Sequence, residues 1–307
     1  MAVIMEVDNI VKHFGTVKAV DDISFKVERG ELFGFLGVNG AGKSTTINML
    51  CTLYPPTRGS VKICGYTLGK EDEKIRKKIG VVYQNNCLDD KLSVKENLLI
   101  RGALYEKNKK KLKQNLNEVS SFLALEDILN RPFEKLSGGQ KRRCEIARAL
   151  MHAPEILFLD EPTTGLDPAT RKNVWEIIKR LRQERNMTVF LTTHYMEEAA
   201  KASHIAIIDA GKRKQFGTPF SLKEQFARDH LRLIPKQGTS LEEMLRENNI
   251  LFKKREESII ISLTNTLESL SLLDQVKGRI SGFEVIQGSM DDVFLNVTGR
   301  ELKNAGN

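Results

Sequence analysis

The sequence predicts an α/β protein in which a mostly parallel sheet lies between two layers of helices. Two observations predict it. Continuous apolar runs at 155–162, 188–194 and 204–209 alternate with helical patterns, as expected for strands that are buried on both faces. The composition also changes near residue 230, which predicts a second, smaller α+β domain in the rest of the chain.

The first domain is expected to span residues 1–230, with strands and turns in its opening section and a helix that begins near Lys43. A helical insert at about 87–152 is expected to form a subdomain at the edge of the sheet. Within it, the segment from Ser93 to Glu96 has the spacing of a capping box. Further strand patterns occur at 3–15, 21–31, 31–37, 59–65 and 79–84.

The second domain is expected to span residues 231–307. Its patterns follow the order strand, helix, strand, strand, helix, strand, which is typical of a ferredoxin-like split βαβ unit. One more helix is expected at 289–302. The six patterns are 230–235, 240–248, 250–257, 258–263, 266–280 and 282–288.

The composition is that of a soluble globular protein, with 40% hydrophobic and 29% charged residues in a chain of 307. No apolar run approaches the roughly 18 residues of a membrane-spanning helix, and the N-terminus lacks a signal-peptide pattern. A cytoplasmic location is therefore expected. The net charge is +8, with +9 in residues 1–230 and −1 in the remainder. A basic first domain suits a polyphosphate ligand or an anionic membrane face, although solvated lysines are also common.

The segment 37–46, GVNGAGKSTT, has the spacing G-x-x-x-x-G-K-[ST] of a phosphate-binding loop between a strand and a helix. Its glycines allow several backbone N–H groups to converge on an anion, and the following helix adds its positive N-terminal end. Lys43 is expected to contact the β- and γ-phosphates, and Ser44 to bind Mg²⁺. The alternative is a glycine-rich turn without a ligand. The expected nucleotide contacts are Gly37, Asn39, Gly40, Ala41, Gly42, Lys43, Ser44 and Thr45.

Two acidic residues follow the apolar run at 155–162. Asp160, at the end of the expected strand, is placed to hold Mg²⁺ directly or through water, and Glu161 follows it immediately. Phosphoryl transfer to water needs a group that orients and polarises that water, so Glu161 is the candidate general base. The alternative is that the two acids only cap the next loop.

A second glycine-rich stretch, LSGGQ at 136–140, also enters a helix that Ser137 can cap. It is again suited to an anion, although a single nucleotide needs only one such loop. Two loops in one chain therefore indicate that the second serves a nucleotide held by another copy. Its expected contacts with that nucleotide are Ser137, Gly138, Gly139 and Gln140.

With these motifs in this order, residues 1 to about 230 resemble the nucleotide-binding subunit of an ATP-binding cassette (ABC) transporter. The resemblance implies the fold of that P-loop cassette, with a mixed sheet and with antiparallel β and helical subdomains. It implies that Gln84 contacts Mg²⁺ and the attacking water, and that His194 contacts the γ-phosphate. It implies that Asp167 crosses a dimer interface and that Phe14 stacks on adenine.

The resemblance further implies ATP and Mg²⁺ as ligands and a head-to-tail dimer with a second copy of the chain. Separately encoded permease subunits would hold the dimer at the cytoplasmic face of the membrane. Two features are similar to the ATPases of ABC-2 type exporters, the daunorubicin-resistance group. They are the segment LTTHYMEEA and the small second domain, whose last helical pattern is 289–302. An importer ATPase is the nearer alternative, and a generic regulatory module is an alternative for the tail. A soluble ABC ATPase acting on nucleic acid or ribosomes would carry two cassettes or a long coiled coil, so no nucleic-acid partner is expected.

Overall fold

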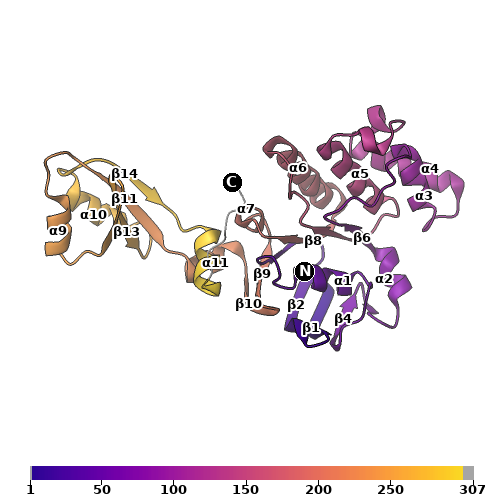
Figure 1. Cartoon of the computed structure of the whole chain (residues 1–307), viewed down its shortest axis with the longest axis horizontal. Helices are drawn as coiled ribbons and strands as arrows, with labels where there is room; N and C mark the ends of the chain where they lie inside the picture. Colours follow the sequence, from indigo (N-terminus) through magenta and orange to yellow (C-terminus); the bar gives the residue numbers. More distant parts are fainter. Residues whose placement is uncertain (1, 300–307) are drawn as a thin grey trace. The chain divides into compact units, whose positions relative to one another are not determined.

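The computed structural model describes residues 2–299 and divides the chain into two units, Met1–Phe216 and Gly217–Asn307 (Figure 1). The boundary expected near residue 230 therefore lies earlier. The reason is α8 (Pro219–Phe226), which packs against α11 (Met290–Thr298) of the second unit. The Asn296 amide also donates a hydrogen bond of 2.7 Å to the Phe226 carbonyl. A change in composition shows where the balance of charged residues changes, and this position need not coincide with the boundary between packed units.

The first unit is built on a six-stranded sheet with the strand order β10-β9-β3-β8-β7-β6. Strands β3, β7 and β8 are buried at every residue, and the pairs β3–β8, β3–β9, β7–β8 and β6–β7 are parallel. The carboxyl ends of these strands therefore meet at one edge of the sheet, where ligands of open α/β sheets bind. The strands are β3 (Leu32–Leu36), β6 (Ile79–Val82), β7 (Ile156–Asp160), β8 (Thr188–Thr193), β9 (His204–Asp209) and β10 (Lys212–Gly217).

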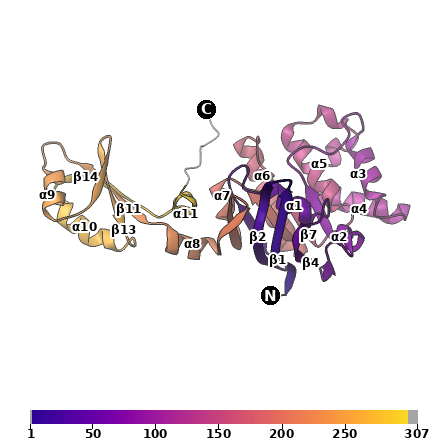
Figure 2. The same cartoon turned by 60° about the horizontal axis from the view of Figure 1, so that its bottom comes forward.

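A separate four-stranded sheet has the order β2-β1-β4-β5, with antiparallel pairs throughout (Figure 2). It shares one hydrophobic core with β3, β7, β8 and α1, including a cluster of phenylalanines centred on Phe190. The short strand β5 and helix α2 were not expected from the sequence. The elements are β1 (Val3–Phe14), β2 (Val17–Glu28), α1 (Lys43–Leu50), β4 (Arg58–Ile63), β5 (Tyr66–Thr67) and α2 (Asp72–Lys78).

The helical insert consists of α3 (Val94–Gly102), α4 (Lys109–Phe122) and α5 (Gly138–Leu150), which pack on one another beside the sheet (Figure 1). The predicted capping box is confirmed, because Ser93 accepts a hydrogen bond from the Glu96 N–H and Glu96 accepts one from the Ser93 N–H. Helix α6 (Pro168–Arg185) follows β7, and α7 (Met196–Ala199) follows β8. None of the helices within residues 2–299 has the length and apolar character to cross a membrane.

The second unit contains an antiparallel sheet with the order β12-β13-β11-β14. Numbered within the unit, this order is 2-3-1-4, so the ferredoxin-like βαββαβ prediction is confirmed. Leu231 and Leu233 of β11 pack against α9 and α10 in a core of their own. Residues 300–302 of the expected last helix lie outside the described residues. The elements are β11 (Asp229–Pro235), α9 (Leu241–Glu247), β12 (Phe252–Arg255), β13 (Ser258–Leu263), α10 (Glu268–Val276) and β14 (Ile280–Ile286).

Candidate functional site

The glycine-rich loop between β3 and α1 is packed so closely that two of its glycines cannot be replaced without strain. A Cβ on Gly42 would lie 2.5 Å from the Ala19 carbonyl oxygen, and Gly42 has a φ of 102°. A Cβ on Gly37 would lie 2.5 Å from the Ile208 carbonyl oxygen. Gly42 is also the N-cap of α1 and places no side chain on the helix N–H groups. These N–H groups are therefore left for an anion.

Lys43 is the charged centre of the loop and is only 4% exposed. Its ammonium donates hydrogen bonds to the carbonyl oxygens of Gly37 (2.8 Å) and Val38 (3.2 Å), and it lies 3.1 Å from Glu161 Oε1. His194 Nδ1 lies 3.3 Å from the same Glu161 oxygen. The structure thus brings together three groups that are up to 151 positions apart in the sequence.

Glu161 and Asp160 are adjacent, but their environments shift their pKa values in opposite directions. The neighbouring His194 imidazole and the charge of Lys43 lower the pKa of Glu161 to about 2. Burial raises the pKa of Asp160, opposed in part by hydrogen bonds from Thr192 and Ser44. Glu161 is therefore ionised at neutral pH and can accept a proton or orient a water. Its backbone has a φ of 46°, a strained conformation of the kind that occurs at active sites.

Most of the predicted phosphate-binding residues line one cavity of about 480 Å³. Gln84 and Glu161 line the same cavity, although they come from different loops. Segments that the sequence analysis missed complete its wall, at 17–19 and 210–211. They carry no motif, and only folding brings them to the loop. The predicted residues in this cavity are Asn39, Gly40, Gly42, Lys43, Ser44, Thr45, Gln84 and Glu161.

The residues around Asp160 fit a magnesium ion. Within residues 2–299 no group of three or more His, Cys, Asp or Glu side chains forms a metal site. Ser44 supplies a hydroxyl beside Asp160, and Gln84 lines the adjoining cavity. Mg²⁺ prefers oxygen ligands and is commonly held by one or two carboxylates together with substrate phosphates. This donor set is of that kind.

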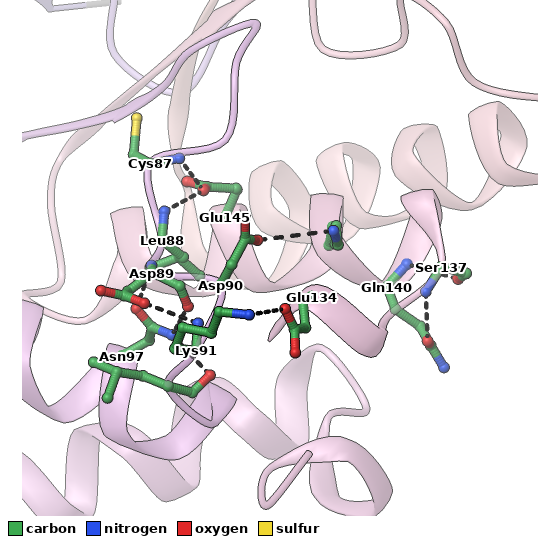
Figure 3. Close-up of polar contacts among 12 residues, drawn as sticks. Cys87, Leu88, Asp89, Asp90, Lys91, Asn97, Glu134, Ser137, Gln140 and Glu145 are labelled. Carbon is green, nitrogen blue, oxygen red and sulfur yellow. Dashed lines mark hydrogen bonds and ion pairs between the residues drawn. The ribbon is translucent and has the colours of Figure 1, made fainter. Parts of the chain in front are cut away.

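The second glycine-rich loop lies at a different cavity, also of about 480 Å³, between α5 and α6. Ser137, Gly139 and Gln140 line it, and none of them lines the cavity of Lys43. The prediction that Ser137 caps α5 is confirmed, and Gln140 completes a capping box (Figure 3). Gly138 is the first residue of α5. The two loops therefore do not share one cavity within a single chain.

Side chains of α5 connect this second loop to the segment that follows Gln84. The Glu145 carboxylate accepts hydrogen bonds from the N–H groups of Cys87 (2.5 Å) and Leu88 (3.0 Å), as Figure 3 shows. Arg142 donates to the carbonyl oxygens of Tyr83 (2.6 Å) and Pro162 (2.7 Å). Helix α5 is thus bound to the loops of both Gln84 and Glu161. The sequence carried no signal for these contacts.

Asp167 and Phe14 lie outside both cavities. Asp167 is the N-cap of α6, with Pro168 at the first helical position. The Thr170 N–H and hydroxyl hydrogen-bond to its carboxylate, and these bonds lower the pKa of Asp167. Phe14 is 49% exposed and forms a T-shaped ring pair with Tyr54, with the ring centroids 5.6 Å apart. Stacking of Phe14 on adenine stays a prediction.

Comparison with protein families agrees with this arrangement of loops. The family model described as ABC transporter matches residues 20–164, and the model described as ATP-binding protein DrrA1-3-like, C-terminal domain, matches residues 217–298. The linearmycin resistance ATP-binding protein of Bacillus subtilis (strain 168) is 36% identical over 98% of this chain and 100% of its own length. The chain belongs to the ABC transporter family. It is an ABC ATPase, and ATP is its nucleotide.

Two further relatives place this ABC ATPase in the DrrA-like exporter branch of the family. A Nod factor export ATP-binding protein of Cupriavidus pinatubonensis is 35% identical, covering 99% of this chain and 93% of the relative. The daunorubicin/doxorubicin resistance ATP-binding protein of Streptomyces peucetius is 34% identical, covering 96% and 92%. The match to residues 217–298 starts at the unit boundary of the structure.

Solved structures share the fold of the first unit. A dimeric ATP-binding cassette in a post-hydrolysis state, bound to ADP and Pi, has a TM-score of 0.63 and 28% identity. It aligns over 70% of this chain and 98% of its own. The protein cbiO1 from Clostridium perfringens, part of the ABC transporter complex cbiONQ, has a TM-score of 0.67 and 25% identity, over 81% of this chain and 95% of its own. The ABC cassette fold expected from the motifs is confirmed.

Proposed function

We propose that this ABC ATPase drives an ABC-2 type export complex by closing as a head-to-tail dimer around two ATP molecules. The observation that carries the proposal is the separation of the two glycine-rich loops into different cavities of one chain. A second copy can place its 136–140 loop against the nucleotide held by the first. Each ATP would then be bound by both copies, and its binding would favour the closed dimer.

In this proposal Lys43 and the N–H groups of 37–45 bind the phosphates, while Ser44, Gln84 and Asp160 hold Mg²⁺. The metal would neutralise charge on the β- and γ-phosphates. Glu161 orients the attacking water and accepts its proton, and its contact with Lys43 at 3.1 Å must loosen when phosphate binds the ammonium. His194 contacts the γ-phosphate. Its Nδ1 atom also lies 3.3 Å from the carboxylate of Glu161, the group that activates the water.

The second copy supplies Ser137, Gly138, Gly139 and Gln140 to each site, and the loop of Asp167 lies at the interface. The first helical residues of α5 present N–H groups at a loop that carries no cation of its own, so the loop assists binding without completing a site. Phe14 stacks on the adenine ring. Residues 217–298 form an accessory domain that takes no part in the chemistry, because every residue named here lies between Phe14 and His194.

The membrane partner is a separately encoded ABC-2 type permease, and the ATPase associates with it peripherally at the cytoplasmic face. Support comes from the names of the relatives, which export Nod factor or confer resistance to linearmycin and daunorubicin. The export substrate is selected by the permease. Nothing in the proposal brings that substrate into contact with this chain.

The experiment is to purify the tagged full-length chain from membranes of its source cells and to measure Mg·ATP turnover of the recovered complex. We expect an integral membrane protein with several spanning helices to copurify, and the turnover to require Mg²⁺. A strain that carries Glu161→Gln should lose export while the complex still assembles. Copurification of a periplasmic solute-binding protein would point to import, and copurification of ribosomes would overturn the transport assignment.

A further inference from the structure

Glu198 is a buried carboxylate that the chemistry described above does not use. It lies in α7, four residues after His194, and is only 2% exposed, whereas its neighbour Glu197 is exposed. Its three hydrogen-bond partners are two hydroxyl groups and an indole N–H, all of them neutral. A carboxylate buried without a cation costs folding free energy, so stability alone is a poor reason for this arrangement.

The three donors come from separate elements of the site. The Thr193 hydroxyl donates to Glu198 Oε2 at 2.6 Å, and Thr193 directly precedes His194. The Thr163 hydroxyl donates to Glu198 Oε1, and Thr163 lies two residues after Glu161. The indole N–H of Trp175, on α6, donates to the same Oε1 at 3.4 Å. One carboxylate therefore connects the ends of β7 and β8 and the side of α6.

Further hydrogen bonds extend this connection to the phosphate loop and to the loop of Asp167. On one side, the Thr193 carbonyl accepts from the Gly37 N–H at 3.3 Å, and the Thr193 hydroxyl accepts from the Tyr195 N–H at 2.9 Å. On the other side, the Thr163 carbonyl accepts from the Leu166 N–H at 3.1 Å, next to Asp167. A continuous series of hydrogen bonds therefore runs from the start of the phosphate loop, past His194, to the loop of Asp167.

We propose that Glu198 is a positioning residue that holds the His194 loop and the Asp167 loop in a fixed relation to each other. Glu198 does not line the cavity of Lys43. Its two carboxylate oxygens each bind one hydroxyl, so a shift of the His194 loop on contact with the γ-phosphate is transmitted to the loop at the dimer interface. The proposal rests on the ATPase roles assigned above to His194 and Asp167.

The first test compares Glu198→Gln with Glu197→Gln, a matched change at the exposed neighbour. We expect kcat of Glu198→Gln to fall about 10- to 100-fold, because misplacing a catalytic group by about 1 Å can cost about 10² in rate. ATP affinity and thermal stability should remain close to those of the unmodified chain. Glu197→Gln should behave like the unmodified chain. A merely structural role would instead lower stability and ATP affinity together.

The second test uses the hydroxyl of Thr163, which is fully buried. Thr163→Val keeps the shape and removes the donor to Glu198, whereas Thr163→Ser keeps the donor. We expect Thr163→Val to reproduce the kcat defect and Thr163→Ser to retain most of the activity. The double variant Thr163→Val, Glu198→Gln should be no worse than the poorer single variant, because both changes break one network. The comparison of Thr163→Val with Thr163→Ser tests the positioning role even if Glu198→Gln does not fold.

Unchanged kcat in both Glu198→Gln and Thr163→Val would overturn the positioning role. Additive losses in the double variant would overturn it as well. Failure of the proposed function is a separate result, because it is read from the proteins that copurify with the unmodified chain and not from the kcat values of these variants. The two failures are therefore distinguished by different measurements.

Discussion

The two glycine-rich loops both lead into helices, yet they differ in their helix caps and in the charged groups beside them. The loop before α1 has Gly42 as its N-cap, without a side-chain hydrogen bond, and carries Lys43 beside Glu161. The loop before α5 is capped by its own Ser137 and Gln140. Arg143 of α5 lines the cavity of this loop, but its guanidinium donates hydrogen bonds to the carbonyl oxygens of Leu123 and Ala124. Only the first loop therefore combines free N–H groups with a buried cation, and it lies beside the carboxylate proposed as the general base. The second loop can contribute to a nucleotide site in another copy but lacks the groups to form one by itself.

The largest effect that this comparison predicts is on Glu161→Gln, which removes the carboxylate proposed as the base beside the first loop and leaves the loop's phosphate-binding groups intact. Turnover should fall about 10²–10⁴-fold, the usual loss for a missing general base, while ATP still binds. The ATP-bound dimer should then accumulate, which size-exclusion chromatography with Mg·ATP can detect. Glu118→Gln, an exposed change on α4, is the control and should turn over normally. Normal turnover in Glu161→Gln would remove this residue from the mechanism.

The next prediction compares two glycines of the first loop. Gly42→Ala should be destabilising by about 2–6 kcal/mol, because a Cβ would meet the Ala19 carbonyl at 2.5 Å and the backbone has positive φ. Gly40→Ala should cost only the backbone strain of about 1–3 kcal/mol, since nothing lies within 4 Å of its Cβ. Denaturant unfolding of both variants measures the difference. Equal costs would mean that the packing against Ala19 is unimportant.

A matched pair in the second loop should show a smaller effect. A Cβ on Gly139 would lie 2.8 Å from Thr170 Cγ2, and displacement of Thr170 would disturb the hydrogen bonds that cap α6 at Asp167. Gly139→Ala should therefore cost about 1–3 kcal/mol. Gly138→Ala should be neutral or slightly stabilising, because its Cβ would have only one neighbour, at 3.9 Å. Unfolding curves that rank the two the other way would contradict this account of α5–α6 packing.

The smallest predicted effect is on the cap of the second loop. Ser137→Ala removes the hydroxyl that accepts the Gln140 N–H and should cost about 1 kcal/mol of unfolding free energy. Ser93→Ala, the same change at the capping box of α3, is the matched control and should cost a similar amount without affecting ATP turnover. Because Ser137 is also proposed to contact the nucleotide of the other copy, Ser137→Ala should lose more turnover than Ser93→Ala. Equal turnover in the two variants would mean that the Ser137 hydroxyl serves only as a cap.

Much of the fold could be predicted from the sequence, because its main signals come from residues that are neighbours along the chain. These signals are the apolar runs at 156–160 and 188–193 and the motif at 37–44. The same local signals predicted the helix starts at Ser93 and Ser137. The unit boundary at Phe216 was missed because it depends on packing between α8 and α11.

Contacts between residues far apart in the sequence could not be predicted either, because they too depend on how the folded chain packs. The cavity wall at 17–19 and the network around Glu198 join side chains that no spacing rule connects. Glu197 and Glu198 are adjacent in the sequence, and only the structure shows that one is exposed and the other buried.

The most direct measurement of the central claim mixes two inactive variants, Lys43→Ala and Ser137→Arg, and assays ATP turnover. In a head-to-tail dimer of one copy of each, one site carries both defects and the other is intact. We therefore predict that mixing restores part of the activity, with each variant alone inactive. Absence of any recovery, when differential tags show that mixed dimers have formed, would mean that each chain builds its site alone and would contradict the account.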